Sequence, residues 1–155
     1  MSGPTNIFKH PPALAMHYTV LLENIPALGS ADLLGPFTEC SGLEAHYEEF
    51  QWKEGGDNDT IVRLPGRLLP GTVKLSHQVG HGSSALQKWF VETAARLVKG
   101  SATITLLAGD GTSVAKWNLH DAWPVRYCGP TLTTSPAGES IAVETIELAH
   151  GGLTA

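Results

Sequence analysis

The segment from Gly80 to Ala85 has the residue types and spacing that come closest to a known binding chemistry. It reads Gly80-His81-Gly82-Ser83-Ser84-Ala85. Glycines between a predicted strand and a predicted helix are typical of dinucleotide-binding turns, where backbone N–H groups at the helix start hold a pyrophosphate. Asp110 follows the next predicted strand, where such proteins carry the acid that binds a ribose. A small nucleotide-binding enzyme is therefore one hypothesis for this chain.

The surroundings of this segment favour a simple helix entry with flexible glycines. The flanking strands alternate apolar and polar residues, whereas buried parallel strands are apolar throughout. The sequence predicts no second helix to cover the other face of a nucleotide-binding sheet. A chain of 155 residues also leaves no room for a substrate domain beside such a sheet. We predict that the protein binds no nucleotide.

Three other groups of residues resemble metal or hydrolase sites, and each lacks part of the pattern. His77 and His81 are four residues apart, which suits a metal on a helix, but His77 lies in a predicted strand. The calcium-like start Asp57-Asn58-Asp59 lacks the later glycine and glutamate of a calcium loop. The possible hydrolase group lacks a G-x-S-x-G elbow. That group consists of Ser83, Ser84, His81 and Asp110. We predict no catalytic residue, no metal and no cofactor.

The two cysteines, Cys40 and Cys128, lie far apart and form no C-x-x-C motif. Unpaired thiols fit a reducing compartment during folding, and the sequence leaves open whether these two ever pair. Residues 1–12 contain no apolar run typical of a signal peptide, and no stretch approaches the ~20 apolar residues of a membrane span. We expect folding in the cytoplasm and no membrane anchor.

Composition indicates one globular domain. Hydrophobic residues make up 42% of the chain, and fifteen acids against ten Lys and Arg give a formal net charge of −5. A surface that coats nucleic acid needs clustered positive charge, so this balance argues against that function class.

The first half of the chain predicts an arm, two strands and two loops, of which the first covers residues 26–36. Residues 1–16 contain three prolines and no periodic pattern, which indicates a flexible arm before a domain of residues 17–155. Alternation predicts strands over residues 17–25 and 43–52. Turn residues are dense in residues 53–71, which predicts a long loop with a function of its own.

The second half predicts one helix among strands. Residues 72–79 alternate strictly, with Thr72, Lys74, Ser76 and Gln78 on the solvent side. Residues 84–98 predict a helix with an apolar stripe. That stripe consists of Leu86, Trp89, Phe90, Ala94, Leu97 and Val98. Strands follow over residues 102–106, 114–127 with an interruption at Pro124, and 140–149 with a predicted β-bulge. The fold class is mainly β with one helix, an antiparallel sandwich or small barrel.

Charge is distributed unevenly along the chain. Residues 39–59 carry seven acids and one base, and residues 60–108 carry six bases and one acid. Two solvated faces explain this pattern as well as a functional one does. The functional interpretation is a subunit with opposite charges on opposed surfaces, which suits head-to-tail stacking.

A set of short sequence motifs, called phrases below, then points to a family by its order along the chain. The phrases are Ser41-Gly42-Leu43-Glu44, Glu54-Gly55-Gly56-Asp57-Asn58, Arg63-Leu64-Pro65-Gly66-Arg67, Trp117-Asn118, Ala122-Trp123-Pro124-Val125, Gly129-Pro130 and the stretch 144–153. Over residues 17–153 they resemble the tail tube protein family of contractile-tailed phages. The most similar branch includes tube proteins of extracellular contractile injection systems and tailocin-like particles. The arm before His17 and the loop around residues 29–36 look longer than is usual in this family.

The resemblance implies a structural protein and not an enzyme. It implies a rolled β-sandwich or barrel, similar to the haemolysin-coregulated protein of type VI secretion, in hexameric rings that stack into a hollow tube. The expected partners are other copies of the chain, a surrounding sheath, baseplate and tube-cap proteins, and cargo or DNA in the lumen. An alternative within the same particle is a tube initiator or terminator, which the longer arm and loop would suit.

Two sets of candidate residues follow from combining the resemblance with the patterns. Ring stacking is predicted for charged residues of the long loop, namely Glu54, Asp57, Asp59, Arg63 and Arg67. A polar channel lining is predicted for one face of two strands, namely Glu44, His46, Glu48, Thr72, Lys74, Ser76 and Gln78.

Overall fold

The computed structural model describes residues 17–29, 36–53, 55–56, 61–134 and 141–154. In this part the strands are β1 (Tyr18–Glu23), β2 (Phe37–Ser41), β3 (Ala45–Trp52), β4 (Val62–Pro70), β5 (Val73–Gln78), β6 (Gly100–Leu107), β7 (Ser113–Cys128), β8 (Val143–Ala149) and β9 (Gly152–Thr154). The helices are α1 (Ser83–Ala95) and the short 3-10 helix η1 (Pro26–Leu28). The predicted arm of residues 1–16, the calcium-like Asp57–Asp59 and Glu54 lie outside the described residues.

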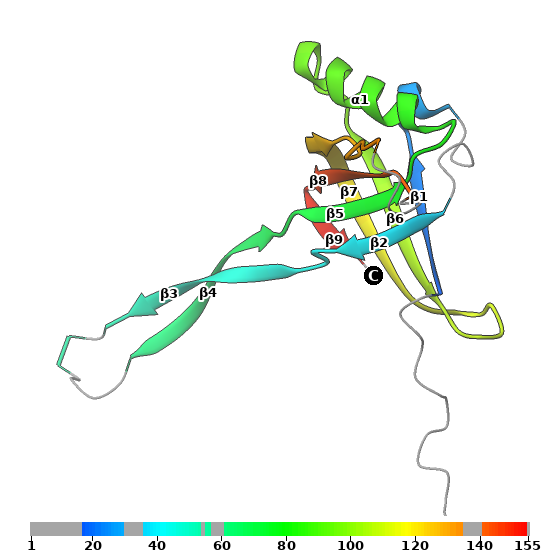
Figure 1. The fold of residues 1–155 in the computed structure, drawn as a ribbon. Helices are drawn as coiled ribbons and strands as arrows, with labels where there is room; N and C mark the ends of the chain where they lie inside the picture. The colour runs from blue at the N-terminus through cyan, green and yellow to red at the C-terminus, as the bar shows by residue number, and fades with distance from the viewer. Residues whose placement is uncertain (1–16, 30–35, 54, 57–60, 135–140, 155) are drawn as a thin grey trace, which may run out of the picture.

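Two antiparallel sheets make up the fold, which confirms the predicted class (Figure 1). The main sheet has the order β1-β6-β7-β8-β5-β2, and β9 pairs with β7. The second sheet contains only β3 and β4. The first half of β7 pairs with β6 and its second half pairs with β8, so this one strand joins two differently oriented parts of the main sheet. This shared strand rolls the sheet around a core.

β7 turns at Asp121, whose φ of 53° lies in the left-handed region. The predicted interruption at Pro124 is wrong, because β7 continues through this residue to Cys128. Pro124 pairs with Leu148, and the register shifts between Pro124 and Arg126. An irregular register tolerates proline, because the position of a missing N–H need not match a carbonyl across the ladder.

The core lies between the rolled sheet and α1, which packs against β7 and η1. Leu86 and Trp89 of α1 are fully buried, and the Trp89 Nε1–H donates a hydrogen bond to the Val98 carbonyl at 3.0 Å. The predicted helix is confirmed but shorter, because Arg96 already has an extended backbone. Leu97 therefore lies beyond the helix and is 54% exposed, so its predicted place in the apolar stripe is wrong. Ala94 of that stripe is exposed as well.

The predicted β-bulge in the last long strand, β8, is also wrong, because the pairing of β8 with β5 is regular. β5 and β8 pair without a register shift from Val73↔Leu148 to Gln78↔Val143. The apolar alternation of β8 is broken because Glu144, a carboxylate, occupies the core side of the strand. The strand β9, which follows it, was not predicted.

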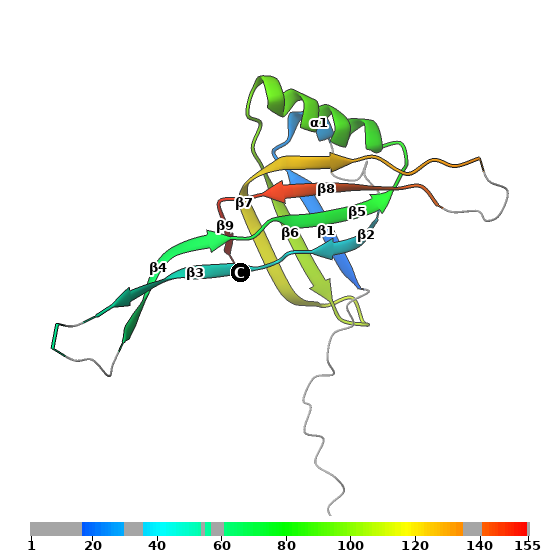
Figure 2. The same ribbon diagram turned by 60° about the vertical axis from the view of Figure 1, so that its left-hand side comes forward.

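The predicted long loop of residues 53–71 contains a strand. Residues 62–70 form β4, which pairs with β3 in a hairpin that extends away from the main sheet in both views (Figures 1 and 2). We call β3 and β4 together the hairpin arm. Pro65 and Pro70 were the reason for predicting a loop here. A two-stranded ribbon tolerates proline, because each strand has a free edge at which no N–H donor is needed. The register shifts between Tyr47 and Glu49, and Gly66 lies so close to the Glu48 carbonyl that a Cβ there would be 2.9 Å from its oxygen.

Candidate assembly surfaces

The hairpin arm carries large apolar side chains that are exposed in the described part of the chain. Phe50 lies opposite Leu64 and Trp52 lies opposite Val62, so the four side chains share one face of the ribbon. Each is between 43% and 54% exposed, and the Phe50 and Trp52 ring centroids are 6.5 Å apart. We call Phe50, Trp52, Val62 and Leu64 the arm's apolar face. Tyr47 and Leu68, a further cross-strand pair, are 59% and 43% exposed.

Such an arm is unfavourable for a chain alone in water. An isolated two-stranded hairpin is marginally stable, and contiguous exposed apolar surface marks a site that another molecule covers. The sequence did not predict this surface, because alternation in a strand normally indicates one buried side. β3 has no core on either side, and all eight of its residues are exposed.

The predicted stacking residues that the structure describes also lie on the arm. Arg63 forms an ion pair with Glu49 at 3.7 Å, and both side chains are about two-thirds exposed. Arg67 is exposed at the irregular part of the ladder, beside Gly66. Charge and apolar surface thus occur together on one projecting element.

The predicted channel residues lie on two separate sheets. Lys74, Ser76 and Gln78 are in β5 of the main sheet, whereas His46 and Glu48 are in the arm, with Glu44 just before it. Thr72 precedes β5 and is exposed. The structure therefore does not bring the two sets together on one face within a single chain.

The side of the main sheet that carries Lys74 and Gln78 is polar. Lys74 lies opposite Glu147 of β8 and Ser41 of β2, and Arg126 of β7 forms an ion pair with Glu147 at 3.5 Å. Ser76 differs from its predicted exposure, since it is only 4% exposed. Its hydroxyl lies 3.0 Å from the Thr145 hydroxyl.

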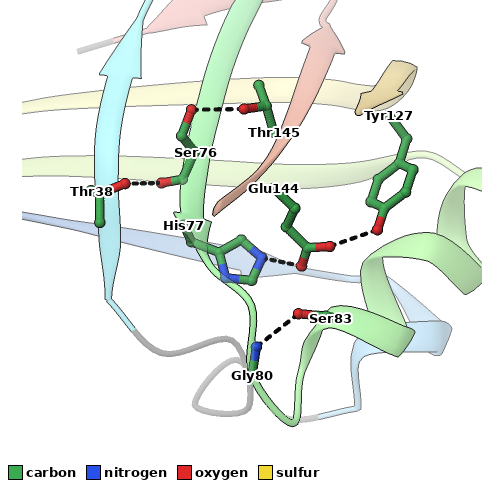
Figure 3. A network of polar contacts seen from close by, with 8 residues as sticks. All are labelled: Thr38, Ser76, His77, Gly80, Ser83, Tyr127, Glu144 and Thr145. Carbon is green, nitrogen blue, oxygen red and sulfur yellow. Dashed lines mark hydrogen bonds and ion pairs between the residues drawn. The ribbon is translucent and has the colours of Figure 1, made fainter. Parts of the chain in front are cut away.

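The opposite side of the same strands buries a polar network (Figure 3). His77 Nε2 lies 2.7 Å from Glu144 Oε1, and both side chains are 1% exposed. The Tyr127 hydroxyl donates a hydrogen bond to Glu144 Oε2 at 2.6 Å. Burial and then this bond to Glu144 raise the pKa of Tyr127 to about 12. The Phe37 ring meets the His77 ring edge-on at 5.4 Å and encloses the network further. The network joins β5, β7 and β8, with His77 and Glu144 deeply buried and Tyr127 half-buried.

The glycine turn that resembled a nucleotide site is the turn that leads into α1, and its residues hydrogen-bond to each other. Gly80 N donates to Ser83 Oγ at 3.0 Å, and Ser83 N donates to the Gly80 carbonyl at 3.1 Å. The strands on either side, β5 and β6, belong to antiparallel pairs. Asp110 lies in the β6–β7 turn, where its carboxylate accepts hydrogen bonds from Thr112 that lower the pKa of the carboxyl group.

The residues of the other candidate sites, the two histidines and the two cysteines, do not form a site in the described part of the chain. His77 is buried in its network and His81 is exposed. Among the described residues, no group of three or more His, Cys, Asp or Glu side chains could hold a metal. Cys40 and Cys128 are both free thiols. Burial, with a smaller effect of Glu39, raises the pKa of the Cys40 thiol to about 11, so the thiol is unreactive at neutral pH. No helix in the described part of the chain is long and apolar enough to cross a membrane.

Solved structures share this architecture over nearly the whole chain. The tube in an extracellular contractile injection system, "PVC sheath-tube complex in extended state", matches with a TM-score of 0.77 and 23% identity, covering 99% of this chain and 97% of that one. The anti-feeding prophage cap, described as "AFP tube terminating cap", matches with a TM-score of 0.77 and 25% identity, covering 97% and 94%. Hcp1 from Flavobacterium johnsoniae matches more distantly, with a TM-score of 0.52 and 13% identity over 89% of this chain and 98% of that one. No curated protein matches the sequence.

The family comparison agrees with the fold and with the resemblance in the sequence. The family model described as "T4-like virus tail tube protein gp19" matches residues 15–154. This match includes every described strand, α1 and the hairpin arm. The chain therefore belongs to the T4-like tail tube protein family.

Proposed function

We propose that this chain is the structural subunit of the inner tube of a contractile tail or contractile injection particle. In this proposal, six copies form a ring and the rings stack around a central channel. The single observation that carries the proposal is the hairpin arm, which exposes a continuous apolar face in a chain of the tail tube family. A surface of this kind needs another protein to cover it. The family is one of structural tube proteins, so we propose no catalytic activity.

The channel is lined in this proposal by the polar side of the main sheet. β1 and β2 are the outer strands of the described sheet, so each has an unpaired edge. Pairing of β2 with a neighbouring copy would extend the sheet around the ring and remove that edge. Lys74 and Gln78 would then face the channel beside the Arg126–Glu147 pair. Such a wall holds water and is mainly polar toward passing cargo or DNA, with Val143 opposite Gln78 as an exposed apolar side chain at its end.

Ring stacking is assigned to the hairpin arm. The arm contains the described candidates Arg63 and Arg67, and the chain between its two strands contains Glu54, Asp57 and Asp59. His46 and Glu48, proposed above for the channel, would line it only where the arm crosses the junction between rings. This arrangement allows both predicted sets to serve one tube although they lie on separate sheets.

The remaining partners follow from the outer surface. α1 presents Lys88 and Glu92, an exposed ion pair at 3.7 Å, and a shallow groove beside it is lined by Pro26, Ala95 and Leu97. This outer surface suits a surrounding sheath protein. Baseplate and cap proteins would contact the ends of the tube. We further propose assembly in the cytoplasm before the particle acts elsewhere.

A second candidate function is a ring that starts or ends the tube. The similarity to the anti-feeding prophage tube terminating cap, equal in TM-score to the tube match, favours it. A tube subunit stacks on itself without limit, whereas a terminal ring stops after one layer. Negative-stain electron microscopy of the purified full chain tests both. Tubes with a central hole support the tube subunit, single rings support the terminal ring, and monomers at high concentration contradict both.

A further inference from the structure

Two exposed apolar surfaces lie at opposite ends of the main sheet. One is the arm's apolar face. The other, which we call the end patch, consists of Ile141 and Val143, with exposed fractions of 66% and 40%. Val79 N donates to the Ala142 carbonyl at 2.9 Å, and Val143 pairs with Gln78. Val143 therefore lies beside the end of β5, on the face of the sheet that carries Gln78, with Ile141 two residues before it in the sequence; the exposed Val79 lies on the other face.

β5 connects the two surfaces directly. It begins at Val73, three residues after the arm ends at Pro70, and it ends at Gln78 beside the end patch. Figure 2 shows the arm projecting to one side of the molecule and the end of β5 pointing to the other. An arm and a patch that point in opposite directions cannot meet within one copy, but they can meet between copies that are stacked in the same orientation.

We propose that the arm's apolar face of one copy docks on the end patch of a copy in the adjacent ring. This inference rests on the proposed function, which supplies the rings, and it names the surface that receives the arm. The contact joins two different surfaces, so it is heterologous and repeats without limit along an axis. Phe50 and Trp52 are the expected anchors, because large aromatic side chains dominate the energetics of such interfaces.

Charge favours this pairing of surfaces. Residues 44–70, which include the arm, contain six acids and three bases. The segments around the end patch, residues 77–84 and 129–143, contain one acid, Glu139. His81 belongs to these segments, and Lys88 of the following helix α1 has a side chain that is 65% exposed. An acidic arm meets fewer acids at this end than at another acidic arm, which favours a head-to-tail encounter over arm-to-arm contact.

A mixing experiment with two variants tests the inference. The arm variant carries Phe50→Ser and Trp52→Ser, and the patch variant carries Ile141→Asp and Val143→Asp. Each variant should form single rings and no tubes. An equimolar mixture should form pairs of rings and nothing longer, because the intact arms of one variant can dock only on the intact patches of the other. Sedimentation velocity and negative-stain electron microscopy measure ring, pair and tube.

Controls separate assembly from folding. Val91→Ser changes a side chain on α1 that is 61% exposed and should leave tube length unchanged. All substituted side chains are exposed, so circular dichroism and the unfolding temperature should match the unaltered protein. As an independent measurement, Phe50→Cys and Ile141→Cys placed together should give oxidised, covalently linked chains across ring junctions in assembled tubes.

Four results would overturn the inference. Tubes of normal length from either variant alone would show that the altered surface is not needed. A mixture that stays as single rings would show that the two surfaces do not meet. A loss of tubes in the Val91→Ser control would show that the arm and the end patch are not special. Unaltered protein that forms no rings at all would instead contradict the proposed function, and the inference with it.

Discussion

His77 and Glu144 face each other inside the core, with His77 Nε2 2.7 Å from Glu144 Oε1 and both side chains 1% exposed. The two residues are direct neighbours across the β5–β8 ladder. Tyr127 of β7 binds the second oxygen of Glu144 at 2.6 Å. One carboxylate therefore links three adjacent strands of the sheet that we propose as the channel wall. The opposite side of those strands is polar and faces away from the core.

Removal of this carboxylate should destabilise the fold strongly. Glu144→Ala leaves the buried His77 and the half-buried Tyr127 without their acceptor, and breaking a buried pair from one side costs about 3–5 kcal/mol. Chemical denaturation of the variant should show a loss of this size in the free energy of unfolding. Glu147→Ala, two residues away on the solvent side, removes a surface ion pair with Arg126 and should cost about 0–1 kcal/mol. Equal losses for the two variants would contradict the structural role of the network.

Alkaline pH should weaken the fold through Tyr127. Burial and the bond to Glu144 raise its pKa from 10.0 to about 12, so the folded protein holds the phenol proton more tightly than the unfolded chain does. This stabilisation is complete below pH 10.0 and is lost as the pH rises to about 12. Cys40 acts in the same direction between pH 9.0 and about 11. Tyr127→Phe should flatten the fall in unfolding temperature above pH 10, and an unchanged slope would show that Tyr127 does not contribute to it.

Helix docking should depend on Trp89. The ring is fully buried and donates a hydrogen bond to Val98, so Trp89→Ala should cost about 3–5 kcal/mol in the free energy of unfolding. Leu97→Ala is the matched control, because this exposed side chain should change stability by less than about 0.5 kcal/mol. A loss below about 1 kcal/mol for Trp89→Ala would show that α1 does not hold the core.

Charge reversal on the arm should prevent stacking while rings remain. Arg63→Glu together with Arg67→Glu places two new acids beside Glu48 and Glu49, and residues 44–70 are already acidic. Electron microscopy should then show rings in place of tubes, and high salt should shorten tubes of the unaltered protein because exposed charges are screened. Tube lengths that do not change in the variant would contradict a role for these arginines.

The channel assignment predicts a pattern of thiol reactivity in assembled tubes. Cysteines at Lys74 and Gln78 should react with a small thiol reagent and be shielded from one too bulky to enter the bore. A cysteine at Lys88 on α1 should react with both. Ser76 is a poor probe position because it is 4% exposed even in the single chain. Equal reactivity of all three sites toward the bulky reagent would place Lys74 and Gln78 outside the channel.

The sequence predicted most elements of the fold because their alternation reflects one buried side. It failed where that assumption fails. In β8, a buried glutamate on the core side looked like a break in the apolar pattern, and only the three-dimensional contact with His77 and Tyr127 explains it. In β4, prolines and a glycine suggested a loop, although a two-stranded ribbon with free edges accepts them. The apolar face of the arm could not be predicted either. Phe50 and Glu49 are both exposed in a single chain, so their alternation does not reflect a buried side.

The most direct test of the account is an electron cryomicroscopy reconstruction of the purified protein assembled alone. We expect six-fold rings stacked into a hollow tube, with Lys74, Gln78 and the Arg126–Glu147 pair on the channel wall and α1 on the outer surface. A tube with α1 in the channel, a ring of another symmetry, or a protein that remains monomeric would contradict the central claim.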